Sequence, residues 1–188
     1  ATAGVYYGSS GCDPTYFSCQ ISNSDFGFSF HSCNRSFSEE SINGTVILDN
    51  IISQFAVPGG TITASRTWDY IEQGYAVLGT VSIYHWDIPR LTIAEGNTLR
   101  FAPGKKLEIA YSNNSSNNNY RGELFAEGTE EMPVIFKSLG DTVDGWGGIA
   151  FYNSSDITGL QSFLKNCIIE QAATNLSCTY TNQPEIDS

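Results

Sequence analysis

The chain has 188 residues, enough for one hydrophobic core or for one domain with a small appendage. Its formal net charge is -11, with nine Lys and Arg, which argues against nucleic acid and anionic membrane surfaces as partners because both require basic residues. No apolar run is long enough to span a membrane. Charged residues make up only 15%, and Ser, Thr, Asn and Gly are abundant, a composition common in secreted proteins. We therefore expect an extracellular or cell-surface protein without membrane insertion.

Residues 1–57 form the first predicted region, which is rich in Cys, Ser and aromatic residues. Two segments, Phe26–Phe30 and Thr45–Leu48, alternate in the manner of strands. Asn43-Gly44 is a strong turn dipeptide directly before the second of them. We expect this region to be a small β cap that carries disulfides.

Five cysteines occur, none with the paired CxxC spacing of a zinc site, so disulfides in an oxidising compartment are the better interpretation. We favour a bond between Cys167 and Cys178, which flank one short connection. Two of the three N-terminal cysteines are expected to pair, as Cys12 with Cys33 or Cys19 with Cys33. The odd cysteine is then buried and free, or bonds to another chain.

The second region, residues 58–173, is a series of three-residue apolar segments separated by tight turns. The outer residues of each segment are apolar and the middle one is often polar, as with Thr92, Arg100 and Glu108, so one face should be buried and the other exposed. Many short strands with a turn at every corner are typical of a β-solenoid. The predicted strands are Thr61–Thr63, Tyr75–Val77, Val81–Ile83, Leu91–Ile93, Leu99–Phe101, Leu107–Ile109, Leu124–Ala126, Val134–Phe136, Ile149–Phe151 and Cys167–Ile169.

The third region, residues 174–188, contains a short polar strand around Cys178–Tyr180 and ends in an acidic tail, Pro184–Ser188, without core content. Trp68, between the first two predicted strands of the solenoid, is expected to be a lid over the open end of the stack.

The sequence RGELFAEGTEEMPVIF at residues 121–136 resembles a run found in right-handed parallel β-helix (pectin-lyase-like) proteins of bacterial and archaeal cell surfaces. That family run reads G-x-L-x-A-x-G-T-x-x-x-P-I-x-F-x-S, and the resemblance covers roughly residues 59–173. It implies an all-β fold, a short right-handed parallel β-helix. The same fold hosts adhesins, surface-layer proteins and lyases, so it says little about function. Matching segments are LTIAEG (91–96), FAPG (101–104), GWGGIAF (145–151) and LKNCIIE (164–170).

The predicted β-helix is shorter than is usual in the family, because it has only about four or five coils. A stack this short leaves apolar rungs at each end that must be capped or must meet another molecule. The N-terminal region is a natural cap for one end, whereas the other end has only the Cys178 segment.

Pectate-lyase-like members of this family hold calcium with clustered Asp and abstract a proton with Arg or Lys. The corresponding residues here would be Asp141 and Asp144, with Arg121 or Lys137. Two carboxylates in a polar loop are also ordinary solvated turn residues, and the basic residues are scattered. We therefore expect no enzyme and no cofactor, with calcium at this loop and a polysaccharide lyase or hydrolase as alternatives.

Three further acids, Glu127, Glu130 and Glu131, could form a glycosidase pair, but they fall in a predicted turn, where solvent exposure is expected. The two histidines, His31 and His85, lie far apart and beside no nucleophile motif.

Asn-x-Ser/Thr sequons suggest N-glycosylation, chiefly in the polar run between residues 112 and 119. The sequons are at Asn34, Asn43, Asn113, Asn114, Asn153 and Asn175.

The terminal segment Gly4–Gly8 alternates like a strand, and its residues Val5, Tyr6 and Tyr7 could pair within their own fold, stack on sugars or add to the sheet edge of a neighbouring molecule. Together with the open-ended stack, this favours an extracellular structural protein that assembles with copies of itself, as a surface filament, a surface-layer subunit or an adhesin module. A module that binds or cleaves surface glycans is the alternative.

Overall fold

The computed structural model describes residues 3–7, 20–22, 26–30, 32–34, 46–48, 52–110, 121–140, 145–152, 162–178 and 185–187. Within these ranges the secondary structure consists of strands alone, as the sequence predicts. No helix that could cross a membrane occurs in this part of the chain.

The strands form three parallel sheets and one separate pair. Sheet 1 has seven strands: β1 (Ala3–Tyr7), β3 (Phe26–Phe30), β5 (Ile52–Val57), β8 (Tyr75–Val77), β11 (Thr98–Phe101), β14 (Val134–Ser138) and β17 (Cys167–Ile169). Sheet 2 has five: β6 (Gly60–Ile62), β9 (Val81–Ile83), β12 (Lys106–Ile109), β15 (Gly148–Phe151) and β18 (Leu176–Cys178).

Sheet 3 also has five strands: β7 (Arg66–Trp68), β10 (Arg90–Ile93), β13 (Glu123–Glu127), β16 (Phe163–Lys165) and β19 (Glu185–Asp187). The separate pair is β2 (Gln20–Ser22) with β4 (Val46–Leu48).

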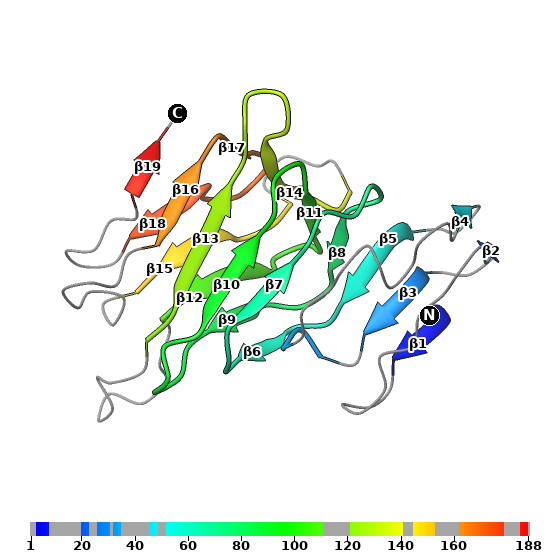
Figure 1. The fold of residues 1–188 in the computed structure, drawn as a ribbon, viewed down its shortest axis with the longest axis horizontal. Coiled ribbons are helices and arrows are strands. Elements are labelled where there is room, and N and C mark those ends of the chain that lie inside the picture. Colours follow the sequence, from blue (N-terminus) through cyan, green and yellow to red (C-terminus); the bar gives the residue numbers. More distant parts are fainter. Residues whose placement is uncertain are drawn as a thin grey trace.

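The chain visits sheets 1, 2 and 3 in the same order five times, from β5–β7 to β17–β19, and each coil pairs in parallel with the one before it. Figure 1 shows the coils following one another along the long axis, from the N-terminal strands on the right to the C-terminal strands on the left. This arrangement is consistent with a parallel β-solenoid, as the turn-punctuated sequence predicts.

The core consists of inward-facing side chains that stack from coil to coil. In sheet 2 the register places Ile62, Ile83, Ile109 and Phe151 in one line, and each is at most 1% exposed. Sheet 3 has an equivalent line, formed by Trp68, Ile93, Ala126 and Leu164. Because each residue packs against the matching residue of the next coil, the pairing register and the core depend on each other.

The lid predicted for Trp68 is wrong. Trp68 pairs in register with Ile93, is 1% exposed, and its ring centroid lies 5.3 Å from that of Tyr75. Trp68 is the last residue of strand β7, and its register with the buried Ile93 directs its side chain into the core. The sequence pattern did not predict strand β7.

The acidic tail, for which the sequence predicts no core content, contains strand β19. Glu185 N donates to Ser162 O at 3.0 Å, and Asn166 N donates to Asp187 O at 3.2 Å. The prediction missed this strand because only one of its residues, Ile186, is apolar, whereas the backbone pairing needs no side-chain pattern.

Sheet 1 runs across the predicted boundary at residue 57, because β5 pairs with β8 and β3 pairs with β5. At least part of the N-terminal region therefore shares a sheet with the later coils.

Asn97 is the buried polar group on which one corner of the stack depends. Its Nδ2 donates to Trp68 O at 3.1 Å and to Ala94 O at 3.2 Å, and its Oδ1 accepts from Ile71 N at 3.2 Å. Replacing Asn97 by a small apolar residue would leave these backbone groups unsatisfied in the core.

We predict that Asn97→Ala lowers the free energy of unfolding by about 2–4 kcal/mol, measured by urea denaturation. Asn175→Ala, at an exposed position, is the matched control and should change it by less than about 0.5 kcal/mol. Equal effects of the two substitutions would contradict a structural role for the buried amide.

Candidate functional site

The last coil, β17–β19, buries its inward positions less completely than the earlier coils do. In sheet 3 the inward line continues from Leu164, 2% exposed, to Ile186, 62% exposed. In sheet 2 it continues from Phe151, 1% exposed, to Cys178, which is exposed. An inward side chain is covered by the coils on both sides of it, and within the described residues the last coil has a neighbour on one side only.

The backbone of this coil also presents open sheet edges within the part of the chain that the structure describes. Asn166 O accepts from Val134 N at 3.2 Å, and Glu170 N donates to Phe136 O at 3.0 Å, so these residues face β14. Backbone groups alternate along a strand, which directs those of Cys167 and Ile169 toward the outer edge. Such an edge is a template for another strand.

Ile168 adds an apolar side chain on the outer face of the same edge. It is the middle residue of β17 and is 44% exposed. The sequence analysis did not single it out, although an apolar middle residue was a visible signal. Phe125 and Ile135 occupy the same position in β13 and β14, so that signal alone does not mark an edge.

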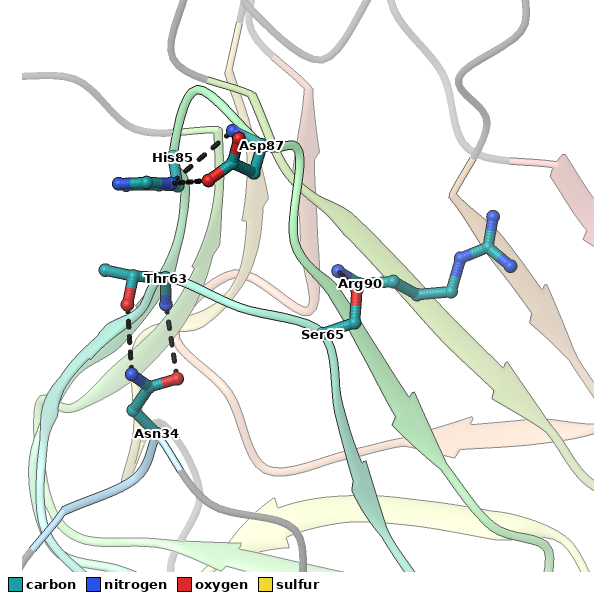
Figure 2. A network of polar contacts seen from close by, with 6 residues as sticks. All are labelled: Asn34, Thr63, Ser65, His85, Asp87 and Arg90. Carbon is teal, nitrogen blue, oxygen red and sulfur yellow. Dashed lines mark hydrogen bonds and ion pairs between the residues drawn. The ribbon is translucent and has the colours of Figure 1, made fainter. Parts of the chain in front are cut away.

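The other end of sheets 2 and 3 is covered by the chain itself. Ile62 and Trp68 lie on the first strands of these sheets, yet they are 0% and 1% exposed. Asn34 Nδ2 donates to Thr63 Oγ1 at 3.0 Å and Thr63 N donates to Asn34 Oδ1 at 3.3 Å (Figure 2), while Arg66 Nε donates to Asn34 O at 2.9 Å. The two ends of the stack are therefore unlike.

The favoured disulfide between Cys167 and Cys178 is not formed, and both thiols are free. Cys167 lies in sheet 1 and Cys178 in sheet 2, and Cys167 Sγ instead donates to Ala126 O at 3.4 Å. Cys33 is free and buried, so neither predicted N-terminal bond to it is present. Its possible partners, Cys12 and Cys19, lie outside the described residues.

Burial changes the acidity of these thiols to different extents. It raises the pKa of Cys33 and of Cys167 to about 11, and it also raises the pKa of the exposed Cys178. Since the thiolate is the reactive form, both burial and pKa protect the first two.

We predict that iodoacetamide at pH 8 alkylates Cys178 at least about tenfold faster than Cys33 and Cys167 in the folded protein. Peptide mass spectrometry resolves the sites, and denatured protein provides the control in which the rates converge. Equal rates for Cys33 and Cys178 in the folded protein would contradict the described end of the stack.

A polar cluster lies on the outer face of sheet 2. Lys106 Nζ lies 2.6 Å from Glu108 Oε1, Tyr152 OH donates to the same oxygen at 3.2 Å, and Ser82 Oγ donates to Glu108 Oε2 at 3.0 Å. The sequence predicted exposure of Glu108, which is instead 5% exposed because these partners surround it. The hydrogen bond to Glu108 raises the pKa of Lys106, so this side chain stays protonated at neutral pH and does not abstract a proton.

A second cluster lies on the outer face of sheet 3, in an open groove. Arg90 Nη2 lies 2.8 Å from Glu123 Oε2, and the guanidinium carbon lies 3.9 Å from the centroid of the Phe125 ring. Thr67 and Thr92 are in register on neighbouring strands along the groove. Together these groups form a polar and aromatic surface of the kind that can contact a sugar.

The predicted catalytic and metal candidates are not brought into one described site. Arg121 precedes β13 in sheet 3 and Lys137 lies on β14 in sheet 1, where its Nζ is 3.9 Å from Glu170 Oε1. Their proposed partners, Asp141 and Asp144, lie outside the described residues. The described residues contain no group of three or more His, Cys, Asp or Glu arranged to hold a metal.

The three glutamates of the predicted turn, Glu127, Glu130 and Glu131, are all exposed, and Lys165 Nζ lies 3.6 Å from Glu127 Oε1. His85 Nδ1 lies 3.2 Å from Asp87 Oδ2 on an exposed turn (Figure 2), and His31 falls outside the described residues.

Two of the sequons can be placed. Asn175 is exposed, whereas Asn34 is half-buried and its side-chain nitrogen donates to Thr63 Oγ1 at 3.0 Å. The sequons at Asn43, Asn113, Asn114 and Asn153 lie outside the described residues.

Comparison of the chain with protein families, with curated proteins and with solved structures found no match. The resemblance to pectin-lyase-like proteins therefore depends on the sequence motifs and on the parallel sheets alone.

Proposed function

We propose that this chain is an extracellular structural protein that assembles with copies of itself through the end of a β-solenoid. A right-handed coil and kinship with pectin-lyase-like surface proteins are part of the proposal, supported by the motif at residues 121–136. An acidic composition with few charged residues, rich in Ser, Thr, Asn and Gly, supports an extracellular location.

The exposure of Ile186 is the observation that carries this proposal. The same inward line is 1%, 1%, 0% and 2% exposed in the four preceding coils, at Trp68, Ile93, Ala126 and Leu164. Fully burying one isoleucine side chain contributes about 1.5–3 kcal/mol, so a partner that covers Ile186 gains part of the free energy that association requires. A stack with such an end is suited to an assembled state.

A carbohydrate-binding or carbohydrate-cleaving module is the second candidate, supported by the groove on the outer face of sheet 3. There the pairing of Arg90 with Glu123 fixes a cation over an aromatic ring, next to a row of threonine hydroxyls. Binding would use the face of the solenoid, whereas assembly would use its end.

We predict that the wild-type protein sediments as species larger than a monomer at tens of micromolar concentration, and that Ile186→Lys shifts it to the monomer, because a charge would be buried at the interface. Trp86→Lys, at an exposed residue between β9 and β10, is the matched control and should leave assembly unchanged. Circular dichroism verifies that both variants fold.

A wild-type monomer at every concentration would overturn the proposal. If that monomer also bound polysaccharide, in a way that Arg90→Ala abolishes, the carbohydrate-binding function would take its place.

A further inference from the structure

We propose that two copies of the chain associate tail to tail, with β17 of one copy pairing antiparallel to β17 of the other about a two-fold axis at Ile168. This rests on the proposed self-assembly and specifies its first contact: an isologous dimer that extends sheet 1 across the interface.

The backbone of β17 fits this pairing. Cys167 and Ile169 direct their N–H and C=O groups to the open edge, whereas those of Ile168 face β14. In a register centred on Ile168, Cys167 lies opposite the partner's Ile169, and the two residues form a hydrogen-bonded pair. The same occurs on the other side of the axis, so the open backbone groups of the strand find partners.

The side chains fit the same register. Cys167 and Ile169 pack against the core of their own chain, and pairing them with the partner's Ile169 and Cys167 extends that core across the axis. On the outer face, Ile168 meets the partner's Ile168 in a non-hydrogen-bonded pair, the closer of the two antiparallel arrangements. This contact accounts for an isoleucine that is 44% exposed in the single chain.

Burial favours this end of the stack as the contact, since the opposite end of sheets 2 and 3 is covered by residues of its own chain. β17 itself carries no charged residue, so an antiparallel copy meets no like charge along the paired strand. The charges that flank it have partners within their own chain, because Lys165 Nζ lies 3.6 Å from Glu127 Oε1 and Lys137 Nζ lies 3.9 Å from Glu170 Oε1.

The dimer would keep β1 at both of its outer ends. Within the described residues β1 pairs with β3 alone, so the predicted assembly strand Val5–Tyr7 is paired on one edge within its own fold. Its outer edge would then be available for growth beyond the dimer.

The first test is oxidative cross-linking of Ile168→Cys in the full chain. Directly opposed residues of a non-hydrogen-bonded pair have Cα atoms about 4.5 Å apart, within the range of a disulfide. Mild oxidation should therefore join position 168 of two copies, identified by peptide mass spectrometry. Trp86→Cys, exposed but far from the axis, should not form the matching link.

The second test uses charge at the axis. Ile168→Lys and Ile168→Glu place like charges opposite each other, and each should weaken dimerisation at least about tenfold in sedimentation equilibrium. Mixing the two variants should restore a heterodimer, because the opposed charges then attract. Failure of the mixture to recover dimers, or unchanged dimerisation of either variant, would overturn the tail-to-tail pairing.

Failure of this inference and failure of the proposed function give different results. A wild-type protein that is monomeric at all concentrations overturns both. Wild-type assemblies that persist in Ile168→Lys overturn only the tail-to-tail contact. A cross-link from Ile168→Cys to Tyr6→Cys, with none between two positions 168, would instead establish head-to-tail stacking.

Discussion

Coil-to-coil stacking of inward side chains is the constraint on which this structure depends. Each strand is only three to six residues long and has no stable partner within its own coil. It is held by the strand before it and the strand after it in the same sheet, through backbone bonds and through one line of apolar side chains. A coil with one neighbour therefore has half of its interactions, and the end of the stack is where the structure is least complete.

The two ends meet this constraint in different ways. At the first strands of sheets 2 and 3, Asn34 bonds to Thr63 and Arg66, and the adjacent Cys33 joins the core. At the last coil, β19 pairs in parallel with β16 of the previous coil, and its inward residue Ile186 is 62% exposed. The outer faces carry polar clusters that are satisfied within the chain, such as the one around Glu108. The end is consequently a stronger candidate for a contact with another molecule than the faces are.

The sequence was a good guide to the strands between Thr61 and Ile169, because a turn residue follows almost every apolar segment. It was a poor guide to whatever depends on register between coils. Trp68 reads as a residue between strands, but its pairing with Ile93 makes it core. The predicted disulfide between Cys167 and Cys178 was wrong for the same reason. The two cysteines are close in sequence, but the chain turns between them and they lie on different sheets.

The candidate site was partly predictable. The number of coils predicted from the sequence is enough to show that the apolar ends of the stack must be covered. Which residues are exposed there depends on the order of the strands in each sheet, and the local sequence does not reveal that order. Ile186 is one apolar residue in an acidic tail, and Ile168 is one of several apolar middle residues. Each becomes notable only when its strand is placed last in its sheet.

The most direct test of the account is amide hydrogen exchange of the wild-type protein at low and high concentration. The account predicts that exchange slows with concentration at the edge amides of Cys167 and Ile169 and in residues 185–187, and stays constant in the central coil β11–β13. Identical exchange of β17 at both concentrations would contradict the claim that the open end of the stack is completed by a second copy.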